Sequence, residues 1–176
     1  MNRRSRFYVR VRHMRIPDWF YRFAYRHGIR AARVWWWISR PRTSGAHLFL
    51  WHQGRVLLLR TSYRTGWTTP GGAIKRGETP IDAAIREARE EIGLQLTAAD
   101  LHPAGVVEHS PDYRRDRLHL FEVHLHTPPA IQIDISEIVE ACFVPRADAP
   151  SFALARPVRD YLSRKATEEQ GMSRQA

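Results

Sequence analysis

Cysteine is almost absent from this chain of 176 residues, in which Cys142 is the only one. No disulfide can therefore form within the chain. A single thiol is typical of proteins that work in a reducing compartment, so we expect the cytoplasm. Long apolar runs are missing too, since no stretch reaches the roughly 18 residues that a membrane-spanning helix needs. The first 18 residues hold no continuous apolar stretch, which argues against a secretory signal.

Acidic residues are scarce at the start of the chain. Residues 1–44 hold twelve Arg and one Asp, a net charge of +11, whereas the whole chain carries +10. The same segment holds ten of the nineteen aromatic residues. Pro, Ser and Gly interrupt the apolar periodicity between Arg40 and Gly45. We therefore predict a basic, aromatic, helical extension over 1–44 and a near-neutral domain over 45–176.

The extension has three interpretations. Apolar residues recur at three- and four-residue steps between Pro17 and Arg40, with arginines on another face, which predicts an amphipathic helix. Packing of this helix on the domain, or pairing in a homodimer, is the interpretation that we favour. Arginines interleaved with aromatic rings also suit contact with RNA. A basic helix rich in tryptophan suits an anionic membrane surface.

Hydrophobic patterning after residue 45 predicts strands and helices in mixed order. Residues 47–51 and 55–60 flank a His-Gln-Gly turn and are expected to form a hairpin. A helix from Pro80 to Ile92 should end at Gly93, a residue that suits the left-handed position after a helix. Further strands are expected at 104–109, 118–126 and 141–144, a loop at 110–117, and a closing helix at 156–165. This order predicts an α+β fold, a sandwich of a mixed sheet and helices.

Three glutamates lie close together on the predicted helix. Glu87, Glu90 and Glu91 share one face, because positions three and four apart are neighbours. The repulsion between them can be offset by arginines such as Arg86 or by a divalent cation. The Pro-Gly-Gly loop before the helix favours the cation, because it offers carbonyl oxygens and Mg²⁺ binds oxygen ligands. The helix's apolar stripe comprises Ile81, Ala84, Ile85, Ala88 and Ile92.

The full pattern resembles the signature of the Nudix family. Gly72, Glu78 and the run from Arg86 to Leu94 match all nine defined positions of a 23-residue motif. The resemblance covers residues 46–165 in the order of elements and leaves out 1–44. It implies a Nudix-like α/β/α sandwich. It also implies a hydrolase that depends on Mg²⁺, with Mn²⁺ as the alternative ion, and cleaves the pyrophosphate of a nucleoside diphosphate linked to another group.

The resemblance also implies roles for single residues. The expected metal ligands are Gly72, through its carbonyl, and Glu87, Glu90 and Glu91. Arg86 and Glu78 are expected to form an ion pair that holds the loop against the helix. A further carboxylate is expected before the last strand, with Glu137 as first candidate and Glu140 as second. The predicted catalytic set is therefore Glu87, Glu90, Arg86 and Glu137, with Glu87 or a neighbour activating water.

Phosphate groups need cationic partners besides a metal ion. The predicted substrate-binding residues are Arg60, Arg64, Tyr113 and Arg115, the arginines for phosphates and the tyrosine ring for a base. Residues that mark substrate subgroups of the family do not fall at the expected spacings, so the nucleotide substrate stays open. The alternative function is a non-catalytic Nudix-like domain that senses nucleotides or binds RNA or a membrane surface. The complete set of glutamates argues for the enzyme.

Overall fold

The computed structural model describes residues 7–8, 42–62, 65–109, 115–134 and 136–173. Most of the extension predicted over 1–44 therefore lies outside the described residues, and so do Arg64 and Tyr113.

A mixed sheet of eight strands forms the centre of the described structure. Its main path runs in the order β1 (Phe7–Tyr8), β8 (Ile138–Pro145), β3 (Arg55–Thr61), β2 (Arg42–His52), β7 (Arg115–Leu125) and β6 (His102–His109). Two short strands, β4 (Trp67–Thr68) and β5 (Gly71–Ala73), pair with β3 and β2. β2 and β7 run parallel over their whole length, and the other pairs are antiparallel.

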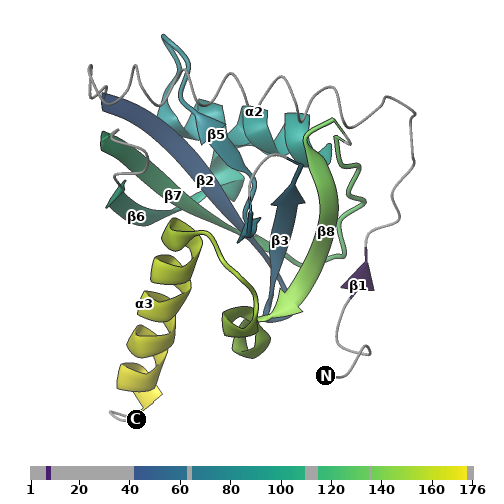
Figure 1. Cartoon of the computed structure of the whole chain (residues 1–176), viewed down its shortest axis with the longest axis vertical. Helices are drawn as coiled ribbons and strands as arrows, with labels where there is room; N and C mark the ends of the chain where they lie inside the picture. Colours follow the sequence, from purple (N-terminus) through teal and green to yellow (C-terminus); the bar gives the residue numbers. More distant parts are fainter. Residues whose placement is uncertain (1–6, 9–41, 63–64, 110–114, 135, 174–176) are drawn as a thin grey trace.

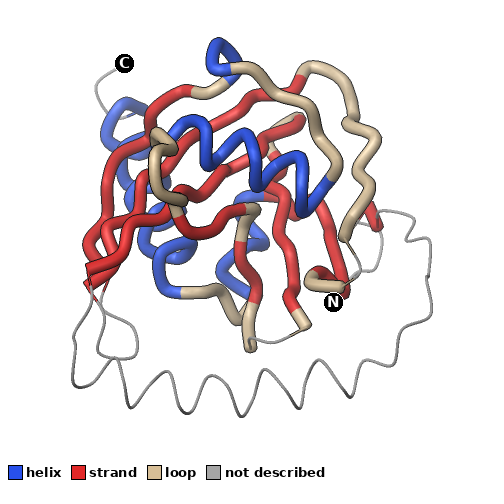
Figure 2. Tube along the Cα trace, turned by 90° about the horizontal axis from the view of Figure 1, so that it is seen from above, coloured by secondary structure: helices blue, strands red, loops and turns tan. Residues whose placement is uncertain are grey.

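Two helices cover opposite faces of this sheet (Figure 1). Successive side chains of a strand point to opposite faces, so each strand contributes to two cores. Leu57 and Leu59 pack on the face of α2 (Pro80–Ile92). Phe49 and Leu58 pack on the other face, with α3 (Arg156–Ser173). Figure 2 shows the same layers from above, and the predicted α/β/α sandwich is confirmed. Two short 3-10 helices complete the described elements, η2 (Ala98–Asp100) and η4 (Arg146–Ser151).

Local sequence fixes both ends of α2. The hydroxyl of Thr79 accepts a hydrogen bond from the Asp82 N–H, and the Asp82 carboxylate accepts one from the Thr79 N–H. This reciprocal cap, followed by Pro80, starts the helix. Gly93 ends it with φ of 67°, in the predicted left-handed conformation. The two caps determine which side chains of α2 face the loop that precedes it.

Residues 115–117 are the clearest departure from prediction. β7 begins at Arg115, so residues 115–117 form part of a strand instead of a loop. They pair with residues 42–44 of the parallel strand β2, which also begins earlier than predicted. Local periodicity carries no trace of this pairing because the two segments are far apart in the chain.

Two further elements differ from prediction at the chain's ends. α3 continues to Ser173, beyond the predicted end at residue 165. β1 adds an edge strand that sequence periodicity does not reveal, since its two residues pair with Cys142 and Phe143 of β8. Cys142 is buried, as expected of a small apolar residue, and as the single cysteine of the sequence it forms no disulfide within the chain. Among the described helices, none combines the length and the apolar character that a bilayer crossing requires.

Candidate metal centre

Glutamates of α2 lie against Gly71 and Gly72, the first two residues of β5, where this strand pairs with β2. Glu91 Oε2 accepts a hydrogen bond of 2.9 Å from the Gly71 N–H. A Cβ atom on Gly72 would stand 2.3 Å from Glu87 Oε1, so a side chain there would have to displace the Glu87 carboxylate. Glycine at this position therefore lets the carboxylate lie against the backbone of the strand.

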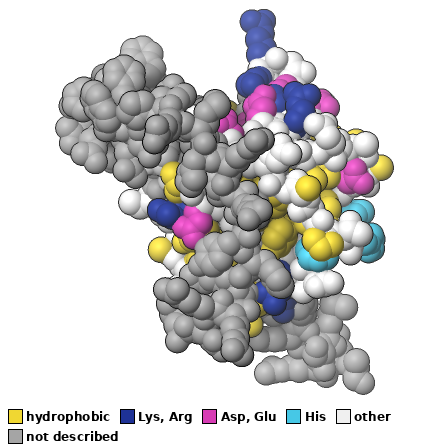
Figure 3. Space-filling model, turned by 90° about the vertical axis from the view of Figure 1, so that its right-hand side faces the viewer, with side chains coloured by type: hydrophobic (Ala, Val, Ile, Leu, Met, Phe, Trp, Pro, Cys, Tyr) yellow, Lys and Arg dark blue, Asp and Glu magenta, His cyan; other side chains and the backbone are white. Residues whose placement is uncertain are grey.

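Arg86 connects the carboxylates to one another and to the loop. Its Nη1 donates to Glu87 Oε1 at 2.6 Å and to Glu90 Oε2 at 3.1 Å, and its Nη2 donates to the Ala73 carbonyl at 2.9 Å. Its Nε donates to Glu78 Oε1 at 2.6 Å, so the expected ion pair is present. This bond lowers the pKa of Glu78 to about 2. Acidic and basic side chains gather at this end of the molecule, the top of Figure 3.

Glu91 is the buried member of the cluster, with 7% of the residue exposed. Burial raises the pKa of Glu91 to about 8, and the negative charges of Glu87, Glu137 and Asp134 add to the rise. The hydrogen bond from Gly71 opposes it. A carboxylate in this position is stabilised in its ionised form only if a cation comes close.

Glu137 joins the cluster from the segment before β8. Partial burial raises the pKa of Glu137, and the charges of Asp134, Glu87 and Glu90 raise it further. The Asp134 N–H donates to the Glu91 carbonyl at 3.0 Å, which fixes this segment to the end of α2. Sequence analysis missed Asp134, although its place three residues before Glu137 in an acidic segment was a usable signal.

Glu140, the second candidate for the extra carboxylate, has another partner. Its Oε2 accepts hydrogen bonds from Arg60 Nε at 3.0 Å and Arg60 Nη2 at 2.9 Å. Arg60, predicted to bind substrate phosphate, is therefore engaged across the β3–β8 pair. Arg115, predicted for the same role, begins β7. Arg64 and Tyr113 lie outside the described residues.

The oxygen atoms near Gly71 and Gly72 are of the kind that bind a hard divalent cation. They belong to carboxylates and a backbone carbonyl, the oxygen ligands that Mg²⁺ takes. The space left by the missing side chain of Gly72 is filled by Glu87. In the described part of the chain, no three acidic, His or Cys side chains converge on one point. The reason is visible in the contacts, because Arg86 holds Glu87 and Glu90 while the Gly71 N–H holds Glu91.

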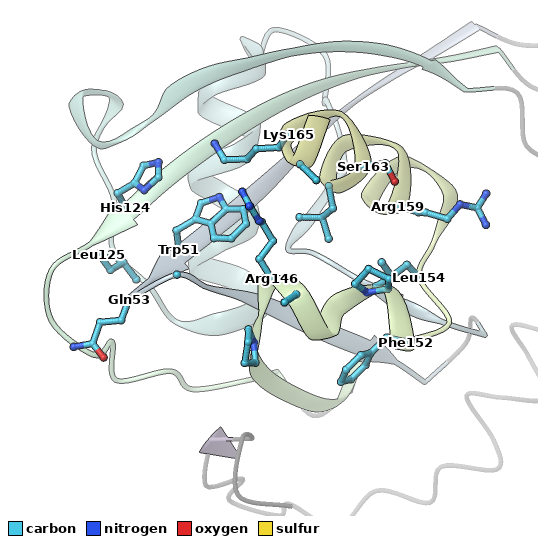
Figure 4. A pocket seen from close by; sticks show the side chains of 16 residues that line it. Trp51, Gln53, His124, Leu125, Arg146, Phe152, Leu154, Arg159, Ser163 and Lys165 are labelled. Atoms are coloured by element: carbon cyan, nitrogen blue, oxygen red, sulfur yellow. The ribbon is translucent and has the colours of Figure 1, made fainter. Parts of the chain in front are cut away.

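A cavity of about 370 Å³ adjoins the cluster. Gly71, Gly72 and Glu91 line it, as does the first turn of α3. A larger cavity of about 990 Å³ lies between α3, η4 and the β2–β3 turn. Figure 4 shows Trp51 inside this larger cavity with Arg146 and Lys165 beside it. None of the clustered carboxylates lines the larger cavity, so the smaller one is the candidate for substrate.

The raised pKa of Glu91 predicts how the stability of the metal-free protein depends on pH. The carboxyl ionises near pH 4.5 in the unfolded chain and near pH 8 in the folded one. Between these values the folded state binds more protons, so the free energy of unfolding falls as pH rises through this window. We expect the melting temperature in EDTA to fall less steeply from pH 5 to pH 8 in Glu91→Gln than in the wild type. Glu168→Gln, on exposed surface, is the matched control, and equal slopes in wild type and Glu91→Gln would contradict the assignment.

Comparisons with known proteins identify the family of the chain. Residues 41–166 match the family model described as NUDIX domain. The RNA pyrophosphohydrolase of Psychrobacter cryohalolentis is 47% identical over 49 residues, which cover 28% of this chain and 28% of that protein. The chain thus spans less than a third of the length of this curated relative.

Solved structures share the fold at lower identity. The MutT protein from Methanosarcina mazei Go1 aligns with a TM-score of 0.64 and 21% identity, covering 74% of this chain and 96% of that one. A C. elegans Ap4A hydrolase binary complex aligns with a TM-score of 0.62 and 22% identity, covering 73% and 98%. The family match and these neighbours confirm the resemblance and the fold class predicted from the sequence.

Proposed function

The chain belongs to the NUDIX domain family, and we propose that it is a Mg²⁺-dependent hydrolase of the pyrophosphate bond in a nucleoside diphosphate linked to another group. The observation that carries the proposal is the concentration of carboxylates beside Gly71 and Gly72 of β5. Glu87, Glu90, Glu91 and Glu137 interact there electrostatically, and one of them is buried. A buried carboxylate such as Glu91 is costly to ionise unless a cation compensates its charge.

Three glutamates and one carbonyl would hold the metal ion, Mg²⁺ or Mn²⁺. These are Glu87, Glu90, Glu91 and the carbonyl of Gly72. When bound, the ion supplies positive charge that lowers the pKa of water and offsets the charge on phosphoryl oxygens. Arg86 is a positioning residue in this scheme, because it contacts the carboxylates and the loop. Its ion pair with Glu78 keeps it in place.

Glu137 is our candidate for accepting the proton of the attacking water. Its carboxylate makes no hydrogen bond with any described residue, so it is available to a water molecule. The pKa of Glu137 is raised, and a carboxylate with a higher pKa is a stronger base for accepting a proton from water. Glu87 is the second candidate, and its oxygen is engaged by Arg86 in the described structure.

The substrate is proposed by class, and the names of two similar proteins suggest candidates within that class. Their names point to an RNA 5′ end and to a dinucleoside polyphosphate. The basic segment 1–44 would give an RNA substrate additional phosphate contacts. The proposal includes a basic extension over residues 1–44 and a hydrolase domain over 45–176. It also includes a cytoplasmic location and assembly as a homodimer.

A product screen tests the proposed function. The full chain is incubated with Mg²⁺ and, separately, with 5′-triphosphorylated RNA, diadenosine tetraphosphate, ADP-ribose and nucleoside triphosphates, and products are identified by mass spectrometry. We expect at least one substrate to be cut at a pyrophosphate bond, and EDTA to abolish the reaction. Binding of these nucleotides without hydrolysis of any of them would favour the non-catalytic, nucleotide-sensing alternative instead.

A further inference from the structure

The larger cavity, of about 990 Å³, takes no part in the proposed reaction. It lies between α3, η4 and the turn that joins β2 to β3, and Figure 4 shows it from close by. The Arg146 N–H donates to the Gly54 carbonyl at 3.2 Å, which fixes the start of η4 to this turn. Proteins bind small organic ligands in pockets of roughly 300 to 1,000 Å³, so this cavity is large enough for one.

Every charged side chain that lines this cavity in the described part of the chain is basic. These side chains are Arg146 of η4 and Arg159 and Lys165 of α3. Arg146 and Lys165 come from different elements, and Figure 4 shows both side chains directed toward Trp51. Lys165 Nζ lies 5.6 Å from the centre of the Trp51 ring. Cations placed near one another repel, and an anion that binds beside them offsets this repulsion.

Two of these cations are held in place by carboxylates outside the lining. Lys165 Nζ donates to Glu122 Oε1 at 2.7 Å, and Arg159 Nε lies 3.8 Å from Asp160 Oδ1. Glu122 also accepts from the Tyr161 hydroxyl, so its charge is shared between two donors. An ammonium carries three N–H donors and a guanidinium five, so one carboxylate does not use all of them. Lys165 is therefore fixed in position and can still donate to an anion in the cavity.

The apolar walls of the cavity are mainly aliphatic. Trp51 is 6% exposed and has Lys165 over its ring, so it offers little surface on which a flat base stacks. An alkyl chain, by contrast, gains from contact with any apolar side chain and adapts to the shape of the wall. The other large apolar side chains of the lining are Leu125, Pro145, Pro150, Phe152, Leu154 and Leu162.

We propose that this cavity is a second ligand site, which binds an amphiphilic anion, namely an alkyl chain that carries a phosphate or carboxylate group. The chain lies on the leucines and prolines, and the anionic group lies on Arg146 and Lys165, because guanidinium and ammonium groups pair with phosphate and carboxylate. The site is separate from the metal centre, since none of the clustered carboxylates lines the cavity. Binding there does not depend on the proposed function.

Octyl phosphate tests the site without turnover, because it contains no pyrophosphate bond. NMR signals of the full chain are followed in EDTA during separate titrations with octyl phosphate, inorganic phosphate and 1-octanol, below the concentration at which octyl phosphate forms micelles. We expect saturable shifts of the Trp51 indole N–H and of the Leu154 and Leu162 methyl groups with octyl phosphate. Inorganic phosphate lacks the chain and 1-octanol lacks the charge, so each should bind about tenfold more weakly or worse.

Recognition of the charge is tested at Arg146. Arg146→Gln should weaken the binding of octyl phosphate about tenfold and leave the binding of 1-octanol within about twofold, because only the first ligand pairs with the guanidinium. Arg146→Lys keeps the positive charge and should restore most of the affinity. Equal losses for octyl phosphate and 1-octanol in Arg146→Gln would contradict the proposed contact.

The place of binding is tested with two neighbouring residues of α3. Ala166 lines the cavity, whereas Thr167 is exposed and is not among the described residues that line it. Ala166→Glu puts a carboxylate beside the bound anion and should weaken the binding of octyl phosphate about tenfold or more. Thr167→Glu adds the same charge to the same helix and is the matched control. Equal weakening by the two variants, both shown to be folded by thermal melting, would place the ligand elsewhere.

The competing ligand for this site is a nucleotide, whose phosphate would use the same cations. AMP is therefore titrated in parallel, and tighter binding of AMP than of octyl phosphate would overturn the assignment of an alkyl chain. Binding of 1-octanol as tight as that of octyl phosphate would overturn the assignment of an anion. If the chain hydrolyses no compound but binds octyl phosphate at Trp51 and Leu162, the proposed function fails and the second site stands.

Discussion

Glu91→Gln is expected to lower turnover by about two orders of magnitude or more, the scale of losing a positioned charge in a catalytic site. The amide keeps the shape of the side chain and can still accept the hydrogen bond that Gly71 donates to Glu91. Folding should therefore survive. Glu90→Gln is expected to cause a loss of similar size, because it removes another proposed ligand from the same cluster.

The two variants should differ in stability. Glu91 is buried, so its replacement removes a costly charge and should raise the melting temperature of the metal-free protein at pH 8. Glu90 is more exposed, with 48% of its side chain accessible, and its replacement should change the melting temperature little. Loss of turnover together with increased stability marks a residue that is retained for function.

Turnover and thermal melting are measured with and without millimolar Mg²⁺. Wild-type protein should be stabilised by the ion, by roughly 2.7 kcal/mol at a hundredfold excess over the dissociation constant. Glu91→Gln should lose most of this stabilisation, whereas the exposed control Glu168→Gln should keep it. Full activity of both Glu90→Gln and Glu91→Gln would exclude the cluster as the metal centre.

The parts of the fold that local interactions determine were predictable from the sequence. The β2–β3 hairpin and α2 were predicted because a short turn, an apolar stripe and a C-terminal glycine are patterns that act within a few residues. The start of β7 and the strand β1 were not, because each depends on pairing with a segment far away in the chain. Periodicity cannot report such pairing.

The candidate site divides in the same way. The spacing of Glu87, Glu90 and Glu91 predicted that they lie together. Arg86 contacts Glu87 and Glu90, and the charge of Glu87 acts on Glu91. The burial of Glu91 could not be predicted, because it depends on how β5 packs against α2, where the Gly71 N–H donates to Glu91. The pairing of Arg60 with Glu140 likewise arises from the register of β3 and β8.

Substitutions at the two neighbouring glycines should have different effects, and the difference tests the proposed role of Glu87. A Cβ on Gly72 would meet Glu87 Oε1 at 2.3 Å, and the end of a side chain can move away. A Cβ on Gly71 would meet the Ala46 carbonyl oxygen at 2.4 Å and His47 Cα at 2.9 Å, and the backbone of β2 cannot move without disturbing the sheet.

Gly71→Ala is therefore expected to destabilise the fold by about 2 kcal/mol or more, the cost of forcing atoms into a packed region. The Gly72→Ala protein should melt close to the wild-type temperature, and its Glu87 carboxylate should be displaced from the backbone of β5. Displacement of a proposed ligand should raise the Mg²⁺ concentration for half-maximal activity about tenfold to a hundredfold. The measurements are thermal melting in EDTA and activity as a function of Mg²⁺. If Gly72→Ala keeps the wild-type metal requirement, Glu87 is not a ligand, and Glu90, Glu91 and Glu137 must hold the ion without it.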